Sequence, residues 1–349
     1  MTERRRRHER EVGQEFPEHE KELVESLGEK YSSIPTDKIE GHRVNSKNHI
    51  MGNGFLRRGW GTILIGGTGV GKSVMALQMA VCVAAGKDFL GRMKVHRPAR
   101  VLLINSQNDI EILKIYTEGI YRHTGIGEKD VRENLDIRFI PGLPQEEFFL
   151  FLEYLLKETR PGLLIVDPFQ DFIGAVDINA YAPFFEWRNK MDNLLQAFKV
   201  ALLTTPHTTK PREREGWMDE EMVYLAAGAA AIANWCRAAC ALLHEKADPA
   251  KYMLQFSKNP IRTGIVNEVG ETVKSLYIEH ASTENDPCWK LSKQQIGALK
   301  VNEEAVVKDA AWSNPSWSYR ELAQALGMSK TTVVKHYPEK LKEIKKERS

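Results

Sequence analysis

Residues 66–73 have the spacing of a phosphate-binding loop, G-x-x-x-x-G-K-S. In such a loop successive backbone N–H groups point at phosphate oxygens, and glycine permits both the unusual dihedral angles and the close approach. Lys72 would contact the β- and γ-phosphates of ATP, and the Ser73 hydroxyl would bind Mg²⁺. We therefore expect the whole loop to bind the nucleotide: Gly66, Gly67, Thr68, Gly69, Val70, Gly71, Lys72 and Ser73.

The sequence around this loop has the order that the motif requires. The apolar run Thr62–Ile65 predicts a strand before it, and Val74–Ala85 predicts a helix after it, whose N-terminus would lie beneath the anion. A glycine-rich turn that binds nothing is the alternative, but it does not require this context. A second apolar run, Leu163–Val166, ends in Asp167. We expect this carboxylate to hold the metal from the strand next to the loop.

Between residues 46 and 280, apolar runs alternate with helical stretches. Short buried strands separated by helices predict crossover connections, and thus an α/β fold with a mostly parallel sheet covered on both faces. The expected strands are Thr62–Ile65, Val101–Ile104, Ile137–Ile140, Leu163–Val166 and Val200–Thr204.

The two ends of the chain differ from this central region. Residues 1–45 are charge-dense, with a weakly helical stretch near Glu18–Leu27, and predict an N-terminal arm without a fold of its own. The polar segment Ala281–Pro287 predicts a linker. We therefore expect an ATPase domain over 46–280 and a separate domain over 288–349.

The composition excludes several classes of protein. Of 349 residues, 42% are hydrophobic and 28% charged, which excludes wholesale disorder and a collagen-like fold, and the net charge of +2 favours no particular partner. Four cysteines without a C-x-x-C pair favour a reducing compartment, the cytoplasm. No apolar run approaches 18 residues, so we expect no membrane span. Cys236, Cys240 and His244 would share one helix face, which we interpret as buried cysteines rather than a metal site.

With these motifs in place, residues 54–265 resemble the RecA-fold replicative helicases of the plasmid RepA type, relatives of the DnaB-type hexameric helicases. The resemblance lies in residues 56–61, 84–91, 101–108, 167–172, 207–211 and 228–237. It implies a RecA-like P-loop NTPase core, ATP and Mg²⁺ as cofactors, DNA as a partner and a homo-oligomer, a hexamer. It also implies that His207 senses the γ-phosphate from the tip of a strand, although a histidine there is more often an exposed loop residue.

One departure from the family concerns the residue that activates the attacking water. The family has a glutamate after the strand that follows the phosphate-loop helix, whereas this sequence has Gln107 there. Glutamine can orient a water but cannot accept its proton, and general-base catalysis contributes about 100- to 10,000-fold. Hydrolysis could therefore be slow while ATP binding remains. Asp109 or Glu111 could take the role, and a shift of the alignment by one or two residues is the other explanation.

Ring-shaped ATPases of this kind complete each site with a cation from the neighbouring subunit. Residues 256–264 resemble the family's basic strand and turn, so the candidates are Arg237, Lys258 and Arg262. Solvated surface charges are the alternative for each of them. The sequence does not choose among the three.

Residues 318–337 have the spacing of a helix-turn-helix. Ser318 and Glu321 would form a capping box, Gly327 would end the first helix, and Ser329 would cap the second. The expected inner face is Leu322, Ala323, Leu326, Val333 and Val334, and the expected DNA-binding face is Lys330, Thr331, Thr332, Lys335 and His336. We therefore expect a small winged-helix or helix-turn-helix domain. A helical subdomain that serves protein contacts is the alternative.

The motifs leave two functions open. The first is a RepA-like replicative helicase, a ring that passes single-stranded DNA and binds duplex DNA through its C-terminal domain. The second is an ATP-switched DNA-binding regulatory protein with little hydrolysis, which Gln107 favours. A recombination-mediator ATPase with the same core is a weaker third interpretation.

Overall fold

The computed structural model describes residues 18–30, 33–40, 46–173, 181–206, 229–244, 251–267, 269–281, 287–292, 299–301, 307–308, 310–311, 317–326 and 328–338. The chain splits into two compact units, Met1–Val44 and Asn45–Ser349. In the first unit, α2 (Glu18–Lys30) covers the stretch in which we expected a weak helix, and α3 (Thr36–Glu40) follows it.

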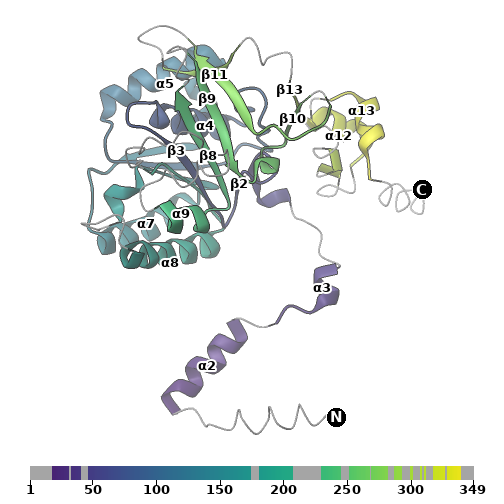
Figure 1. Ribbon diagram of the computed structural model, residues 1–349. Coiled ribbons are helices and arrows are strands. Elements are labelled where there is room, and N and C mark those ends of the chain that lie inside the picture. Colours follow the sequence, from purple (N-terminus) through teal and green to yellow (C-terminus); the bar gives the residue numbers. More distant parts are fainter. Residues whose placement is uncertain are drawn as a thin grey trace. The chain divides into compact units, whose positions relative to one another are not determined.

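The second unit is built on a sheet of nine described strands in the order β12-β11-β9-β8-β3-β7-β6-β4-β5. Figure 1 labels β11, β9, β8 and β3 of this sheet. The strands from β8 to β5 are parallel, and β9, β11 and β12 continue the sheet antiparallel at one edge. The bounds are β3 Gly61–Gly66, β4 Val101–Asn105, β5 Leu135–Phe139, β6 Leu163–Asp167, β7 Ala201–Thr204, β8 Ala238–His244, β9 Tyr252–Lys258, β11 Ser275–His280 and β12 Trp289–Leu291. All five expected strands are present, displaced by at most two residues.

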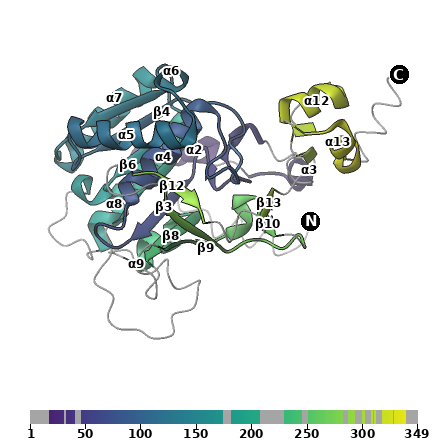
Figure 2. The same cartoon turned by 90° about the horizontal axis from the view of Figure 1, so that it is seen from above.

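Helices cover both faces of this sheet (Figures 1 and 2). One core lies under α4 (Lys72–Ala85), α5 (Ile110–Thr124) and α6 (Glu128–Val131), and the other under α7 (Gln145–Thr159), α8 (Tyr181–Phe198) and α9 (Ala229–Trp235). Alternate strand residues enter opposite cores, as the two-residue period of a strand requires: Leu64 joins the first, and Ile63 and Ile65 join the second. This α/β fold with a largely parallel sheet is consistent with the RecA-like core that the resemblance implies.

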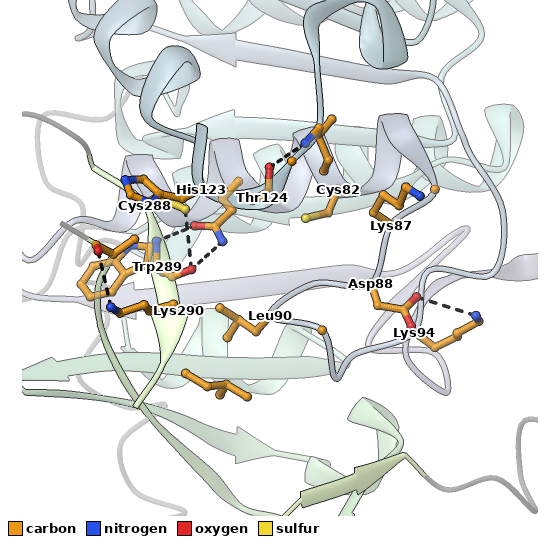
Figure 3. A pocket seen from close by; sticks show the side chains of 17 residues that line it. Cys82, Lys87, Asp88, Leu90, Lys94, His123, Thr124, Cys288, Trp289 and Lys290 are labelled. Carbon is orange, nitrogen blue, oxygen red and sulfur yellow. Dashed lines mark hydrogen bonds and ion pairs between the residues drawn. The ribbon is translucent and has the colours of Figure 1, made fainter. Parts of the chain in front are cut away.

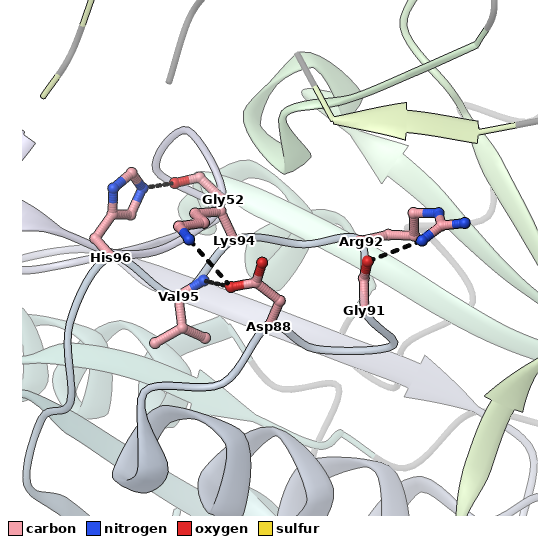
Figure 4. A network of polar contacts seen from close by, with 7 residues as sticks. All are labelled: Gly52, Asp88, Gly91, Arg92, Lys94, Val95 and His96. Carbon is pink, nitrogen blue, oxygen red and sulfur yellow. Dashed lines mark hydrogen bonds and ion pairs between the residues drawn. The ribbon is translucent and has the colours of Figure 1, made fainter. Parts of the chain in front are cut away.

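Two short pairs of antiparallel strands accompany the main sheet in the described part of the chain. β1 (His49–Met51) pairs with β2 (Leu56–Arg57), and β10 (Ile265–Asn267) pairs with β13 (Leu299–Val301). The loop after α4 is held by polar contacts: Asp88 accepts a hydrogen bond from the Val95 N–H (3.0 Å) and pairs with Lys94 (3.8 Å), and His96 bonds to the Gly52 carbonyl (2.8 Å) (Figure 4). Asp88, within residues 84–91 that resemble the family, thus helps to hold this loop in place.

The structure shifts the boundary that we expected between residues 280 and 288. β12, inside the expected C-terminal domain, is the edge strand of the main sheet, and β13 pairs with β10. The strands that pair with the core region therefore extend to Val301, beyond the boundary that we expected.

Two short helices, α12 (Tyr319–Leu326) and α13 (Lys330–His336), lie side by side near the C-terminus (Figure 2). Both expected caps are present: Ser318 and Glu321 bond reciprocally (2.6 and 3.2 Å), and Ser329 accepts from the Thr332 N–H (3.0 Å). A small separate core surrounds them, made of Val307, Ala311, Leu322, Ala323, Val333 and Tyr337. Val334, which we expected inside, is 38% exposed. Gly327 lies outside the described residues.

The segment with Cys236, Cys240 and His244 is not a helix, so they do not share a helix face as we had assumed. Cys236 follows α9, whereas the other two residues belong to β8. The sulfhydryl of Cys240 points at the Ile63 carbonyl (3.8 Å), and burial raises its pKa. Within the described ranges no group of three or more His, Cys, Asp or Glu side chains could hold a metal ion. None of the described helices combines the length and apolar character that a bilayer crossing needs.

Candidate functional site

The phosphate-binding loop begins at Gly66, the last residue of β3, and ends at Ser73, the second residue of α4. Gly69 and Gly71 have φ angles of 75° and 94°, which favour glycine. Gly71 is the N-cap of α4 and no side chain caps this helix, so its first N–H groups remain available to an anion. An ideal Cβ at Gly67 or Gly69 would meet no atom within 4 Å, so the space beside the loop is open. This geometry suits a phosphate group.

Lys72 folds back over its own loop. Its Nζ donates to the carbonyl oxygens of Gly66 (2.7 Å) and Gly67 (2.9 Å), and the residue is only 9% exposed. Burial lowers the pKa of the Lys72 ammonium, and the nearby Asp167 carboxylate partly opposes that shift. Lys72 and Asp167 therefore belong to one electrostatic site.

Asp167 ends β6, but this strand is not the neighbour of β3 as we had expected. β7 lies between them in the sheet. The last residue of β7 and the residue after it connect to β6: Thr204 donates to the Val166 carbonyl (2.8 Å), and Thr205 donates its hydroxyl hydrogen to Asp167 Oδ1. Thr205, fully buried, thus fixes the orientation of the carboxylate. We did not single it out; its only signal is a polar pair at the end of an apolar strand.

The end of β4 presents Gln107. Asn105 pairs in register with Asp167, and its buried side chain accepts hydrogen bonds from the N–H groups of Gln107 (3.1 Å) and Asn108 (2.7 Å). These bonds fix the turn after the strand and leave Gln107 exposed. Asp109 caps α5, because its Oδ1 accepts from the N–H groups of Glu111 and Ile112 (3.0 Å each). It is therefore engaged in the cap.

Trp289 of β12 packs against the phosphate loop at Gly71. Its ring lies 2.7 Å from the position of an ideal Cβ at Gly71, and its indole N–H donates to the Gly71 carbonyl (3.4 Å). The Gln78 side-chain amide pairs with both the N–H and the carbonyl of Trp289 (2.8 Å each), which joins α4 to β12. Any side chain at Gly71 would collide with this ring. No sequence pattern indicated this contact, which joins residues 211 apart.

The pocket beside this contact is separate from the phosphate loop. It has a volume of about 650 Å³ and is lined by the C-terminal half of α4, the loop of residues 86–94, the end of α5 and β12 (Figure 3). No residue of the loop 66–73 lines it. This pocket is therefore not the site at which the phosphate loop would bind a nucleotide.

The three candidate cations lie near the start of β8, and one of them, Arg262, contacts Trp60. The guanidinium groups of Arg57 and Arg262 lie 4.0 and 4.3 Å from the centre of the Trp60 ring. Arg262 donates to the Arg237 carbonyl (2.7 Å), and Lys258 Nζ donates to the Ala233 carbonyl (2.5 Å). We name Arg57, Arg237, Lys258 and Arg262 the cation cluster.

The three arginines of the cation cluster form no ion pair with a carboxylate in the part of the chain that the structure describes. Burial, and then the charges of Arg237 and Arg57, lower the pKa of Arg262. Burial, with His96 and the two arginines 57 and 262, lowers the pKa of His49 to about 4. Such an arrangement favours an anionic partner.

The cation cluster and the phosphate loop lie at opposite ends of the same strands. Arg237 immediately precedes β8, whose Ala238 pairs with Thr62 near the start of β3, whereas Gly66 ends that strand. Six residues of extended chain place the two ends about 17 Å apart. The cluster therefore cannot reach the phosphate loop of its own chain.

The remaining expected residues are distributed as follows. His207 lies outside the described residues, so the expected γ-phosphate sensor is a prediction only. On α13, Lys330, Thr331 and Lys335 are exposed, and Thr332 and His336 are partly exposed.

The groups at the phosphate loop fit a magnesium-bound triphosphate. Lys72 and the uncapped N–H groups of α4 can bind the phosphates, and the oxygens of Ser73 and Asp167 can bind the hard cation.

Comparison with known proteins agrees with this geometry. The sequence profile of a family described as AAA domain matches residues 27–213, more than half of the chain. The matched range includes the phosphate loop, Gln107 and Asp167; three of the four residues of the cation cluster, Trp289 and the C-terminal helices lie outside it. A search of curated proteins gave no match.

Proposed function

The chain belongs to the AAA-domain family of RecA-like P-loop NTPases, and from this premise we propose that it is an ATP-driven motor on DNA, of the RepA helicase type. It would work as a homo-oligomeric ring, a hexamer, in which each ATP is bound by one subunit and completed by the next. Single-stranded DNA would pass through the ring. The C-terminal helices would bind duplex DNA.

The observation that carries this proposal is the separation of the two charged groups along β3. The phosphate loop has an ammonium, Lys72, but no arginine, while three arginines that form no ion pair with a carboxylate of the described residues lie about 17 Å away at the other end of the strand. A head-to-tail contact between copies would bring one chain's cluster to the next chain's phosphates, and repeated head-to-tail contacts close into rings. ATP hydrolysis would then require assembly.

Each residue has a task in this scheme. Ser73 and Asp167 would hold magnesium, which when bound neutralises charge on the β- and γ-phosphates. Lys72 would exchange its carbonyl partners Gly66 and Gly67 for phosphate oxygens. Arg262 is the best candidate for the arginine that acts on the neighbouring subunit's phosphates, because the Trp60 ring and the Arg237 carbonyl hold its guanidinium in place.

ATP turnover with and without single-stranded DNA tests the motor. We expect phosphate release to rise when single-stranded DNA is added to the full-length protein with ATP and Mg²⁺, and to depend on protein concentration because the site is shared. The second candidate, an ATP-switched DNA-binding protein, is favoured by Gln107 at the expected position of the catalytic glutamate. ATP binding without phosphate release in either condition would support the switch and contradict the motor.

Binding of duplex DNA is expected to depend on α13. Replacing exposed Lys330 and Lys335 together by alanine should weaken duplex affinity and reduce the salt dependence of log K by about 2, since each lost phosphate contact removes about 0.9 from the slope. Fluorescence anisotropy of a labelled duplex over a range of salt concentrations measures both. ATP affinity should not change.

A deletion gives the matching control for these two substitutions. It should start after Val301, since a shorter chain loses β12 and with it the contact between Trp289 and the phosphate loop. We expect residues 1–301 to bind ATP normally and to bind duplex weakly. Duplex affinity that is undiminished in both proteins would rule against the C-terminal helices as the DNA-binding element.

A further inference from the structure

A carboxylate that the sequence did not point to lies next to Gln107. Asp171 belongs to the short helix η2 (Phe169–Phe172), which follows Asp167 directly. Its Oδ2 accepts hydrogen bonds from the Ser106 hydroxyl and from the Gln107 side-chain amide (3.4 Å). Ser106 in turn donates its N–H to the Asp167 carbonyl (3.3 Å), so all four residues belong to one local network at the carboxyl edge of the sheet.

The second carboxylate oxygen of Asp171, Oδ1, is available to accept a proton. Oδ1 makes no hydrogen bond to any described residue, and the side chain is exposed. Among the described residues no arginine or lysine forms an ion pair with it. A carboxylate in this state can accept a proton from water, which the amide of Gln107 cannot do.

The other two carboxylates considered from the sequence are less suitable. Asp109 is committed to the N-cap of α5, where its Oδ1 accepts two backbone hydrogen bonds. Glu111 lies in the first turn of α5, and its side chain is exposed with no hydrogen bond to Gln107 among the described residues. Among the hydrogen bonds of the described residues, Asp171 is the one of these three carboxylates that accepts from the Gln107 side chain.

The order of groups along the sheet edge also fits this assignment. Lys72 follows β3, Thr205 follows β7, Asp167 ends β6, and Gln107 with Asp171 comes after β4. Phosphate, metal and water sites would thus succeed one another in that direction. The attacking water would meet the γ-phosphate from the side away from the phosphate loop, as in-line displacement requires.

We propose that Asp171 is the general base of ATP hydrolysis and that Gln107 orients the attacking water. This inference rests on the proposed function. The water oxygen forms a bond to the γ-phosphorus while the bond from that phosphorus to the β–γ bridging oxygen breaks, and its electron pair leaves with ADP. The water proton passes to the Asp171 carboxylate. The expected glutamate is thereby replaced by two residues, one for position and one for the proton.

The test uses full-length protein and separates binding from chemistry. Asp171→Asn keeps the shape of the side chain and one acceptor oxygen for Ser106, but it cannot take a proton. We expect it to slow single-turnover phosphate release by about 100- to 10,000-fold and to leave the dissociation constant for ATP with Mg²⁺ unchanged. Calorimetry measures the affinity, and quenched-flow with radiolabelled ATP measures the rate.

A double variant distinguishes a proton acceptor from a structural residue. Asp171→Asn combined with Gln107→Glu returns a carboxylate to the same contact, and it should recover most of the lost rate. Gln107→Glu by itself is less informative, because two neighbouring carboxylates disfavour each other's ionised form. A structural role for Asp171 predicts no recovery in the double variant.

Each outcome decides the proposal. A normal rate in Asp171→Asn, a comparable loss in Glu111→Gln, loss of ATP affinity together with the rate, or no recovery in the double variant would overturn it. Failure of the proposed function has a different signature: the wild-type protein itself would bind ATP and release no phosphate, with or without DNA.

Discussion

Lys72→Ala is expected to abolish measurable ATP binding. The ammonium is the single positive side chain that contacts the phosphate loop, bonded to the carbonyls of Gly66 and Gly67 among the described residues. On phosphate it would make charge-assisted hydrogen bonds, each contributing about 1.5–3 kcal/mol. Losing two such bonds weakens affinity by about 100-fold or more. Calorimetric titration with ATP and Mg²⁺ measures this directly.

Two companion variants make this result interpretable. Lys72→Met retains an apolar stem in the buried position without the charge, so it separates loss of the ammonium from collapse of the loop. Lys87→Ala removes a lysine just beyond the opposite end of α4, where the side chain is exposed, and should bind ATP normally. Unchanged affinity in both Lys72 variants would refute the assignment of the phosphate loop, and with it every function proposed above.

Local sequence patterns were sufficient for the parts of the site that are local. The phosphate loop, the strand before it and the helix after it are contiguous, and each has a signal in its own residues. Asp167 was found for the same reason, as a carboxylate that ends an apolar run. The capping box of α12 and the N-cap of α13 depend on residues three apart, and both are present.

Local sequence patterns could not predict the order of the strands in the sheet. Nothing in residues 163–167 or 201–204 indicates that β7 inserts between β3 and β6, because neighbour choice depends on the whole sheet. β12 was assigned to a C-terminal domain for the same reason, since its pairing partner β11 lies across the polar segment that resembles a linker. The segment around Cys240 was read as helical because small apolar residues carry little periodicity.

The contacts that position the site are the least predictable part. Trp289 meets Gly71 and Gln78 across more than 200 residues, and Arg262 meets Trp60 across a similar separation. Asp171 meets Gln107 across 64 residues. Each of these pairs is formed by tertiary packing, and no sequence pattern connects the two partners. Motifs therefore identified the groups that would touch ATP, whereas the residues that hold them were found from coordinates.

Arg262→Ala is expected to lower ATP turnover by about 1,000-fold or more, as loss of an arginine that acts across subunits does in related chemistry. ATP affinity of the isolated subunit should not change, because the cation cluster lies at the far end of β3 from the phosphate loop. Arg132→Ala, which removes an exposed arginine paired with Glu128, is the matched control and should turn over ATP normally. Phosphate release at saturating ATP measures the effect.

Mixing two inactive proteins tests whether the arginine acts on the neighbouring subunit. Lys72→Ala retains Arg262 but cannot bind ATP, and Arg262→Ala binds ATP but lacks the arginine. In randomly mixed head-to-tail rings, about a quarter of the contacts join an intact phosphate loop to an intact Arg262. Turnover should therefore reappear on mixing. Activity that only equals the sum of the two proteins, in rings verified by mass photometry, contradicts a shared site.

The same mixing experiment identifies the acting cation within the cluster. With Arg237→Ala or Lys258→Ala in place of Arg262→Ala, recovery is expected only for a variant whose own turnover was lost. Lys258 already donates to the Ala233 carbonyl, and Arg237 contributes its backbone carbonyl to Arg262. Their side chains therefore have less reason than the Arg262 guanidinium to reach a neighbouring phosphate. Loss and recovery confined to Arg237 or Lys258 would transfer the role to that residue while leaving the shared site intact.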